Sequence, residues 1–130
     1  MKKVAILGVS GSIGTSTIEV IRKHPSEFDL VAISVYSNDS CLYSLLDEFK
    51  NIEVVGVKSI DNIKHLIDLY PTVRFVEGQE GLVAVSTSNC DIVLNALVGF
   101  VGLYPTIKAI INNVNVINKL RFMLFLSFNK

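Results

Sequence analysis

The sequence predicts an α/β fold, a doubly wound parallel sheet of the Rossmann-like NAD(P)-binding type. Short apolar segments alternate with segments whose apolar residues recur at helical spacing, and this alternation is typical of right-handed βαβ units. The first apolar segment, residues 4–7, runs directly into a turn with three glycines at residues 8–14. A strand, a glycine-rich turn and a helix in that order present backbone N–H groups to a phosphate.

Each element is predicted from its own pattern. Apolar runs between turn residues predict strands at 4–7, 30–35, 54–57, 73–76, 91–98 and 114–117. Helical periodicity in the intervening segments predicts helices at 16–23, 42–49, 63–70, 79–85 and 103–111. Pro25 and Pro71 end the first and third helices, and Asp61 is expected to cap the third.

The composition is that of one globular domain. The 130 residues are 50% hydrophobic and 18% charged, enough for a core and unlike a disordered chain. The formal net charge is zero, which argues against a nucleic-acid partner, and charges interrupt every apolar run that could span a membrane. Cys41 and Cys90 follow no metal or redox motif, and without a signal peptide they predict reduced thiols in the cytoplasm.

The turn at 8–14 carries the candidate cofactor site. Its spacing is G-x-x-G-x-x-G, with Ser10 in place of the second glycine of the dinucleotide fingerprint G-x-G-x-x-G. We expect Gly8, Gly11 and Gly14 to let the backbone approach a nucleotide phosphate, with Gly11 at a positive φ. The alternative is a purely structural turn that uses glycine only for its conformational freedom.

The segment after the second strand indicates which cofactor binds. NAD-specific domains tend to place an acidic residue at the tip of this strand to bind the ribose 2′-hydroxyl. This chain has Tyr36, Ser37 and Asn38 there, with Asp39 one position further on. A 2′-phosphate is then not repelled, and Ser37 and Asn38 could donate hydrogen bonds to it, which favours NADP over NAD. The same composition is also common in turns that bind nothing.

Few other residues suggest chemistry. Residues 95–102 follow the fifth strand, and the glycines in them could approach the cofactor or simply turn a strand into a helix. His24 and His65 have no neighbouring ligand set and are expected at the surface or at a helix end. No catalytic residue and no metal ligand is assigned.

Two motifs carry a family resemblance that extends from residue 1 to about residue 116. The opening strand and Gly-Val-Ser-Gly-Ser-Ile-Gly at 8–14 resemble the start of the 1-deoxy-D-xylulose 5-phosphate reductoisomerase family, where the motif is Gly-Ser-Thr-Gly-Ser-Ile-Gly. Residues 95–106, Asn-Ala-Leu-Val-Gly-Phe-Val-Gly-Leu-Tyr-Pro-Thr, resemble the family's Asn-Ala-x-Val-Gly-Ala-Ala-Gly-Leu-x-Pro-Thr. The separation of the two motifs also matches.

The resemblance implies an NADPH-binding domain. The family reduces and rearranges 1-deoxy-D-xylulose 5-phosphate to 2-C-methyl-D-erythritol 4-phosphate in non-mevalonate isoprenoid biosynthesis, with NADPH and a divalent metal (Mg or Mn), usually as a cytosolic homodimer. Two groups of residues correspond by position. The residues that correspond to the family's pyrophosphate site are Ser10, Gly11, Ser12 and Ile13, within the turn from Gly8 to Gly14. Those that correspond to its adenosine-phosphate loop are Tyr36, Ser37 and Asn38. The family usually has glycine at the position of Tyr36.

The chain departs from the family pattern near its end. The family continues with Leu-Ala-Asn-Lys-Glu-Ser, whereas residues 116–121 are Val-Ile-Asn-Lys-Leu-Arg, and no acidic residue follows Asp91. We therefore expect an NADPH-binding domain at 1–116 and a divergent hydrophobic tail at 117–130 that reflects a frameshift or truncation, with the catalytic domain absent. The tail could instead be a hydrophobic sixth strand.

Three functions fit these observations. The first is the NADPH-binding portion of a reductoisomerase that is inactive by itself. The second is a non-catalytic nucleotide-binding module or a decayed product. The third is a different small NAD(P) oxidoreductase whose catalytic groups carry no recognised motif.

Overall fold

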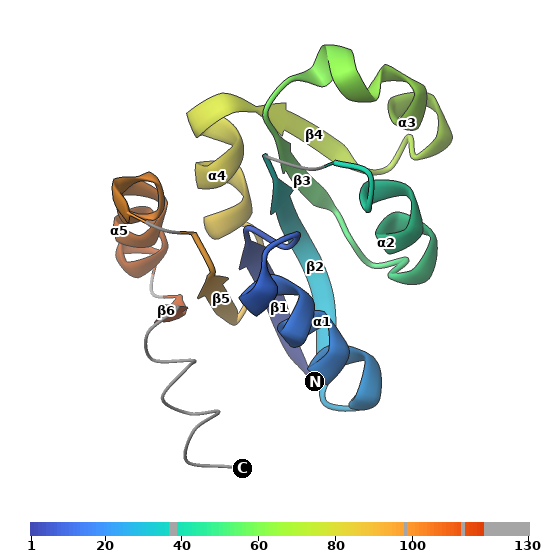
Figure 1. Ribbon diagram of the computed structural model, residues 1–130. Coiled ribbons are helices and arrows are strands. Elements are labelled where there is room, and N and C mark those ends of the chain that lie inside the picture. Colours follow the sequence, from blue (N-terminus) through green and yellow to red (C-terminus); the bar gives the residue numbers. More distant parts are fainter. Residues whose placement is uncertain (37–38, 98, 113, 119–130) are drawn as a thin grey trace.

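The computed structural model describes residues 1–36, 39–97, 99–112 and 114–118, and its centre is one six-stranded sheet (Figure 1). Neighbouring strands of the sheet pair in parallel, and the strand order is β4-β3-β2-β1-β5-β6. The strands are β1 (Lys2–Leu7), β2 (Phe28–Val35), β3 (Val54–Val57), β4 (Arg74–Glu77), β5 (Ile92–Asn95) and β6 (Asn115–Asn118). The predicted α/β class is confirmed.

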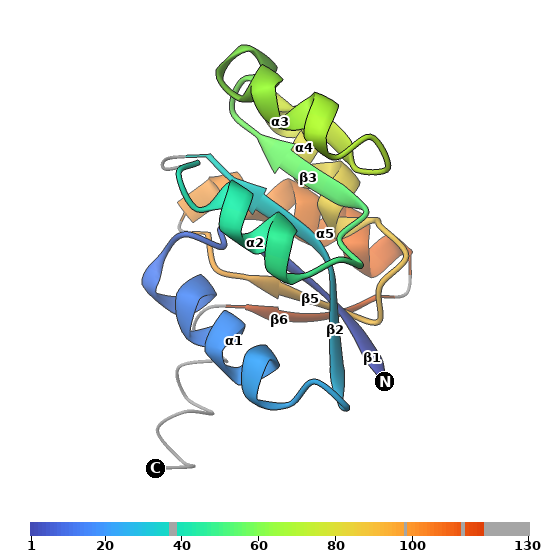
Figure 2. The same ribbon diagram turned by 90° about the vertical axis from the view of Figure 1, so that its right-hand side faces the viewer.

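Helices cover both faces of the sheet (Figure 2). They are α1 (Ser12–Lys23), α2 (Leu42–Glu48), α3 (Lys64–Leu69), α4 (Gly78–Ser86) and α5 (Leu103–Ile111), with short 3₁₀ helices η1 (Ile60–Ile63) before α3 and η2 (Gly99–Gly102) before α5. One core cluster joins the sheet to α1, α2 and α3. A second cluster joins the other face of the sheet to α4 and α5. The layers are therefore helix, sheet, helix, as in a doubly wound fold.

Alternate residues of β1 supply the two cores. Val4 and Ile6 lie in the cluster beneath α1 and α2, whereas Ala5 and Leu7 lie in the cluster beneath α4 and α5. All four are buried. A strand that is buried on both faces needs apolar residues at every position, which is why the opening segment is continuously apolar and does not alternate with polar residues.

The order of the strands places a crevice at the end of β1. From β1 the chain moves through β2 and β3 to β4 on one side, and then returns to add β5 and β6 on the other side. Ligands of such sheets bind outside the carboxyl ends of the strands at this switch point. The turn at 8–14 follows β1 directly, so the fold places the glycines at this position.

The predicted elements are present in the predicted order, with changes in their ends. The fifth strand was predicted at 91–98 but ends at Asn95, because the Asn95 side chain accepts a hydrogen bond from the Leu97 N–H and donates one to the Gly102 carbonyl. The loop therefore folds back toward the Asn95 side chain and leaves the hydrogen-bonding pattern of the sheet.

The prediction that Asp61 caps the third helix was wrong. Ser59 occupies the cap position of η1, and the Asp61 carboxylate instead contacts the Lys64 ammonium at 3.2 Å. The sixth strand includes Ile117, which the sequence predicts both as the end of a strand at 114–117 and as the start of the tail, and Asn118, which it places in the tail alone. Residues 119–130, the rest of that tail, lie outside the described residues.

Helix α5 shows an apolar outer face. Pro105 and Ala109 are buried against the sheet, whereas the opposite side of the helix exposes large apolar side chains at Leu103, Tyr104, Ile107, Ile110 and Ile111. The helix therefore leaves these apolar side chains uncovered among the residues that the structure describes.

Removing side-chain volume from the middle of β2 should unfold the domain more easily. Ile33 is fully buried in the cluster beneath α1 and α2, so Ile33→Ala is expected to lower the free energy of unfolding by about 2–5 kcal/mol. Val20→Ala, on the exposed side of α1, is the matched control and should change it by less than about 0.5 kcal/mol. Urea denaturation of both variants measures the difference, and equal losses would contradict the described core.

Candidate cofactor site

Gly8 turns the chain out of β1. Its φ is +80°, a conformation that residues with a side chain rarely adopt. A Cβ at this position would also lie 2.9 Å from Leu97 Cδ2. The backbone conformation therefore requires glycine at the first position of the motif, and Leu97 would have to shift to admit a side chain there.

Gly14 sets how closely α1 approaches the end of β1. A Cβ on Gly14 would lie 2.4 Å from the Gly8 carbonyl oxygen and 2.6 Å from that of Val9. No side chain fits between the helix and the turn at such a separation. The third glycine of the motif is therefore required for packing of the helix against the turn, as in dinucleotide-binding folds.

Gly11 differs from the other two glycines. It is the N-cap residue of α1 with φ −76°, so the expectation of a positive φ at Gly11 was wrong, and the positive φ occurs at Gly8 instead. A Cβ on Gly11 would meet only the Gly8 carbonyl oxygen, at 3.8 Å. Because Gly11 is also exposed, the fold itself tolerates a side chain there, and the space above it is open to a ligand.

The start of α1 presents backbone N–H groups. The first N–H groups of a helix have no carbonyl partner within it, and here they belong to Ser12, Ile13 and Gly14. The cap residue makes no side-chain hydrogen bond, and the first turn of α1 contains no acidic residue. Unpaired N–H groups and the positive end of the helix dipole together favour an anion at this point.

Tyr36, the first residue predicted for the adenosine-phosphate loop, is bonded to α4. Its hydroxyl donates a hydrogen bond to the Gly78 carbonyl at the start of α4, and its ring packs against the core beneath α4 and α5. Burial raises the pKa of Tyr36 to about 12, so the hydroxyl stays protonated at neutral pH. Ser37 and Asn38, the other two residues predicted for the adenosine-phosphate loop, lie outside the described residues.

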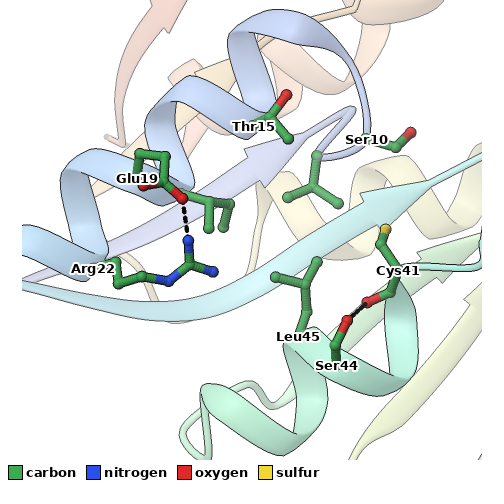
Figure 3. Close-up of a pocket in the computed structure, with 9 residues that line it drawn as sticks. Ser10, Thr15, Glu19, Arg22, Cys41, Ser44 and Leu45 are labelled. Atoms are coloured by element: carbon green, nitrogen blue, oxygen red, sulfur yellow. Dashed lines mark hydrogen bonds and ion pairs between the residues drawn. The ribbon is translucent and has the colours of Figure 1, made fainter.

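A hollow of about 260 Å³ opens between α1 and α2 beside the glycine turn (Figure 3). Its floor is apolar and its rim is polar, and it is lined by Val9, Ser10, Thr15, Ile18, Glu19, Arg22, Cys41, Ser44 and Leu45. Figure 3 shows Glu19 and Arg22 from α1 facing Cys41 and Ser44 from the start of α2.

Arg22, the cation in this lining, is already paired. Its Nε and Nη2 donate to the two carboxylate oxygens of Glu48 at 2.6 and 2.7 Å, and Nη1 contacts Glu19. The hydrogen bonds with Glu48 raise the pKa of Arg22 and hold the pKa of the Glu48 carboxyl below its usual range. Two carboxylates thus neutralise the guanidinium, and the hollow does not favour a phosphate. Anion binding at this edge depends on the backbone N–H groups of the turn.

Residues 95–102 have a structural role in the described part of the chain. The Asn95 amide donates to Thr106 Oγ1 at 2.9 Å, and the Thr106 hydroxyl donates to the Gly102 carbonyl at 2.6 Å. A Cβ on Gly102 would lie 2.5 Å from Asn95 Nδ2. Of the two alternatives that the sequence left open for Gly102, this packing supports a strand-to-helix turn.

The remaining candidate groups lie at the surface or are protonated. His24 is the exposed C-cap of α1, with Nδ1 3.0 Å from Glu27, and His65 is exposed on α3, as predicted. Cys41 and Cys90 form no disulfide in the described part of the chain, and burial raises the pKa of both thiols. Among the described residues no group of three or more His, Cys, Asp or Glu could hold a metal ion, and no helix is long and apolar enough to cross a membrane.

Comparison with known proteins identifies the family. The family model for 1-deoxy-D-xylulose 5-phosphate reductoisomerase matches residues 4–119. The chain belongs to this family. A curated relative, 1-deoxy-D-xylulose 5-phosphate reductoisomerase from Geobacillus sp. (strain WCH70), is 45% identical over 112 residues, which are 85% of this chain and 29% of the relative. The Clostridium perfringens (strain SM101 / Type A) reductoisomerase is 38% identical over 89% of this chain and 31% of its own.

Solved reductoisomerase structures have the same fold. A structure described as DOX-P reductoisomerase in complex with NADPH, fosmidomycin and magnesium matches with a TM-score of 0.79 and 30% identity, over 89% of this chain and 29% of that chain. The Zymomonas mobilis enzyme in complex with NADPH matches with a TM-score of 0.78 at 23% identity, which supports the fold alone. The chain thus spans about three tenths of the length of these relatives.

Two polar residues that organise the site edge were missed from the sequence. Ser34 of β2 accepts a hydrogen bond from the Gly8 N–H, and Asn95 of β5 holds the loop that follows it. Asn95 is the one polar residue of β5, and Ser34 directly follows four apolar residues of β2. A buried polar side chain is nearly always hydrogen-bonded, and this was the available signal, although it does not indicate the partner.

The described packing predicts different effects of a small side chain at two glycines of the turn. Gly14→Ala should lower the free energy of unfolding by about 1–3 kcal/mol, because the added carbon overlaps two carbonyl oxygens. Gly11→Ser should leave it unchanged or raise it slightly, since serine is a favoured N-cap residue and the space is open. Thermal denaturation of the two variants is the test, and an equal loss in both would mean that the turn is packed differently.

Proposed function

We propose that this chain binds NADPH at the carboxyl edge of its sheet, as the cofactor-binding portion of a 1-deoxy-D-xylulose 5-phosphate reductoisomerase. The main support is the start of α1, where backbone N–H groups and an open glycine cap lie at the switch point of the sheet. Membership of the reductoisomerase family gives this anion site a cofactor, since a related structure is described as a complex with NADPH.

The proposed contacts follow the turn from residue to residue. Gly8 and Gly14 shape the turn, whereas the backbone at Ser10, Gly11, Ser12 and Ile13 faces the pyrophosphate. Ser37 and Asn38 bind the 2′-phosphate of the adenosine, and Tyr36 fixes the start of their loop through its hydrogen bond to Gly78. Binding through N–H dipoles needs no lysine or arginine side chain at the pyrophosphate.

In the proposed reaction this chain holds and orients the hydride donor. When bound, NADPH supplies the hydride for reduction of rearranged 1-deoxy-D-xylulose 5-phosphate, and the anchored pyrophosphate fixes the position of the nicotinamide relative to the sheet. The homodimeric state and the cytoplasmic location of the family are carried over as predictions.

The residues described do not fit the family's divalent metal. Such an ion takes oxygen ligands, usually carboxylates. The described residues contain no suitable cluster, and the last acidic residue of the sequence is Asp91. Metal-dependent rearrangement would therefore need ligands from outside this sequence, which supports cofactor binding without turnover by this polypeptide alone.

The first test is cofactor binding by the purified chain. Titration that follows NADPH fluorescence should show saturable binding with a lower Kd for NADPH than for NADH, because no carboxylate at the tip of β2 repels the 2′-phosphate. Gly11→Val should reduce the affinity for NADPH by at least about 100-fold, or about 2.7 kcal/mol, by placing a branched side chain where the pyrophosphate approaches. Val20→Ala on the same helix is the control and should bind normally.

Three outcomes would contradict this proposal. Tighter binding of NADH would reject the 2′-phosphate argument. Normal binding by Gly11→Val would reject the location of the pyrophosphate. An unfolded Gly11→Val variant, seen by circular dichroism, would contradict the open environment of Gly11.

The second test is activity. The 130-residue chain, mixed with 1-deoxy-D-xylulose 5-phosphate, NADPH and either Mg²⁺ or Mn²⁺, should oxidise no NADPH, because the sequence lacks a carboxylate cluster for the metal. A full-length reductoisomerase in the same assay is the positive control. Oxidation of NADPH by the chain that depends on both substrate and metal would overturn this expectation.

A further inference from the structure

We infer that Ser34 is a positioning residue for the cofactor pyrophosphate, because it fixes the first two N–H groups of the glycine turn. This inference rests on the proposed function and adds a residue of β2 to the α1 site. Ser34 is fully buried. Its side-chain Oγ accepts a hydrogen bond from the Gly8 N–H at 2.8 Å, and its carbonyl oxygen accepts one from the Val9 N–H at 3.0 Å.

The side chain of Ser34 provides an acceptor that the sheet does not. The pairing of β1 with β5 ends at Leu7, and Gly8 then turns away with its positive φ. The Gly8 N–H has therefore left the ladder but is still only partly exposed. A buried N–H without a partner is unfavourable by about 1–3 kcal/mol, so the hydroxyl stabilises this orientation of the peptide.

The orientation at Gly8 is passed on to the phosphate-binding groups. The Gly8 carbonyl oxygen accepts from the Gly11 N–H at 3.4 Å and lies directly against Gly14. The Gly8 residue thus connects Ser34 on one side with the cap of α1 on the other. A shift of the Gly8 peptide would displace the N–H groups that follow the cap, which are the groups proposed to bind the pyrophosphate.

Ser34 acts from the neighbouring strand, not from the motif. It shares the α4 side of β2 with Ala32 and Tyr36, two residues away in either direction. Gly56 of β3 leaves room beside it, since a Cβ there would lie 3.3 Å from Ser34 Cβ. The small hydroxyl therefore fits a site that a larger polar side chain would overfill.

The experiment compares two buried serines. Ser34→Ala removes the acceptor of the Gly8 N–H, whereas Ser86→Ala removes an equally buried hydroxyl that donates to the Val83 carbonyl within α4. NADPH and ADP, which contain a pyrophosphate, and adenosine 2′-monophosphate, which does not, are titrated against each variant by NMR. In parallel, hydrogen exchange of the Gly8 and Val9 amides is measured without ligand.

For Ser34→Ala we expect affinity for NADPH and ADP to fall about 10-fold, or about 1.4 kcal/mol, with binding of adenosine 2′-monophosphate within about 2-fold. The Gly8 amide should exchange at least about 10-fold faster, since its opening free energy falls by the value of a lost hydrogen bond. Ser86→Ala should change neither the affinities for the three ligands nor the exchange rate of the Gly8 amide, although this variant also loses stability.

The other possible results overturn the inference about Ser34 or reject the proposed function. Unchanged NADPH binding and unchanged Gly8 exchange in Ser34→Ala would overturn the inference, as would an equal loss for all three ligands, which indicates general loosening. If the wild-type chain binds no NADPH, the proposed function fails. The exchange rate of Gly8 then still decides whether Ser34 holds the turn, and an unchanged rate would overturn that as well.

Discussion

The architecture at the carboxyl edge depends on how closely α1 approaches the end of β1. The helix begins so near the preceding turn that a single added carbon at Gly14 would overlap two carbonyl oxygens. This contact fixes the direction of α1, and with it the direction of the N–H groups and the helix dipole at its start. Gly8, with its positive φ, makes the approach possible by turning the chain within one residue.

The opposite face of the sheet is built by a similar contact. A Cβ on Gly56 of β3 would lie 2.9 Å from the Gly81 carbonyl oxygen in α4, and one on Gly81 would lie 2.3 Å from that of Val76. Helix α4 therefore lies directly on the strands. This position brings Gly78 within reach of the Tyr36 hydroxyl. The loop after β2 is thus tied to α4 on one face, while Ser34 ties β2 to the turn before α1.

The electrostatics of the edge follow from these contacts. Arg22, in the last turn of α1, is occupied by Glu19 and Glu48, so its charge stabilises the contact between α1 and α2. An anion at the turn is left to the backbone, whose N–H groups are oriented by the packing and need no flexible side chain to be ordered. Preorganised dipoles of this kind bind with little loss of conformational entropy on association.

The sequence by itself determined the class of fold, the order of the elements and the location of the glycine-rich turn between β1 and α1. Apolar runs and helical periodicity are local properties, and a glycine that follows a strand is visible without knowledge of its neighbours. The two family motifs, at 8–14 and 95–106, likewise lie within continuous stretches. For this reason they predicted the family that the comparison with known proteins shows.

Only the tertiary structure decided what each polar residue and each glycine does. Gly11 and Gly14 look equivalent in the G-x-x-G-x-x-G motif. A Cβ on Gly11 would face open space, whereas a Cβ on Gly14 would overlap two carbonyl oxygens. Ser34 acts on Gly8 across 26 positions of sequence, and the Tyr36 hydroxyl donates a hydrogen bond to the Gly78 carbonyl at the start of α4. These roles depend on distances between segments that are remote in the chain, and such distances are fixed only when the layers pack.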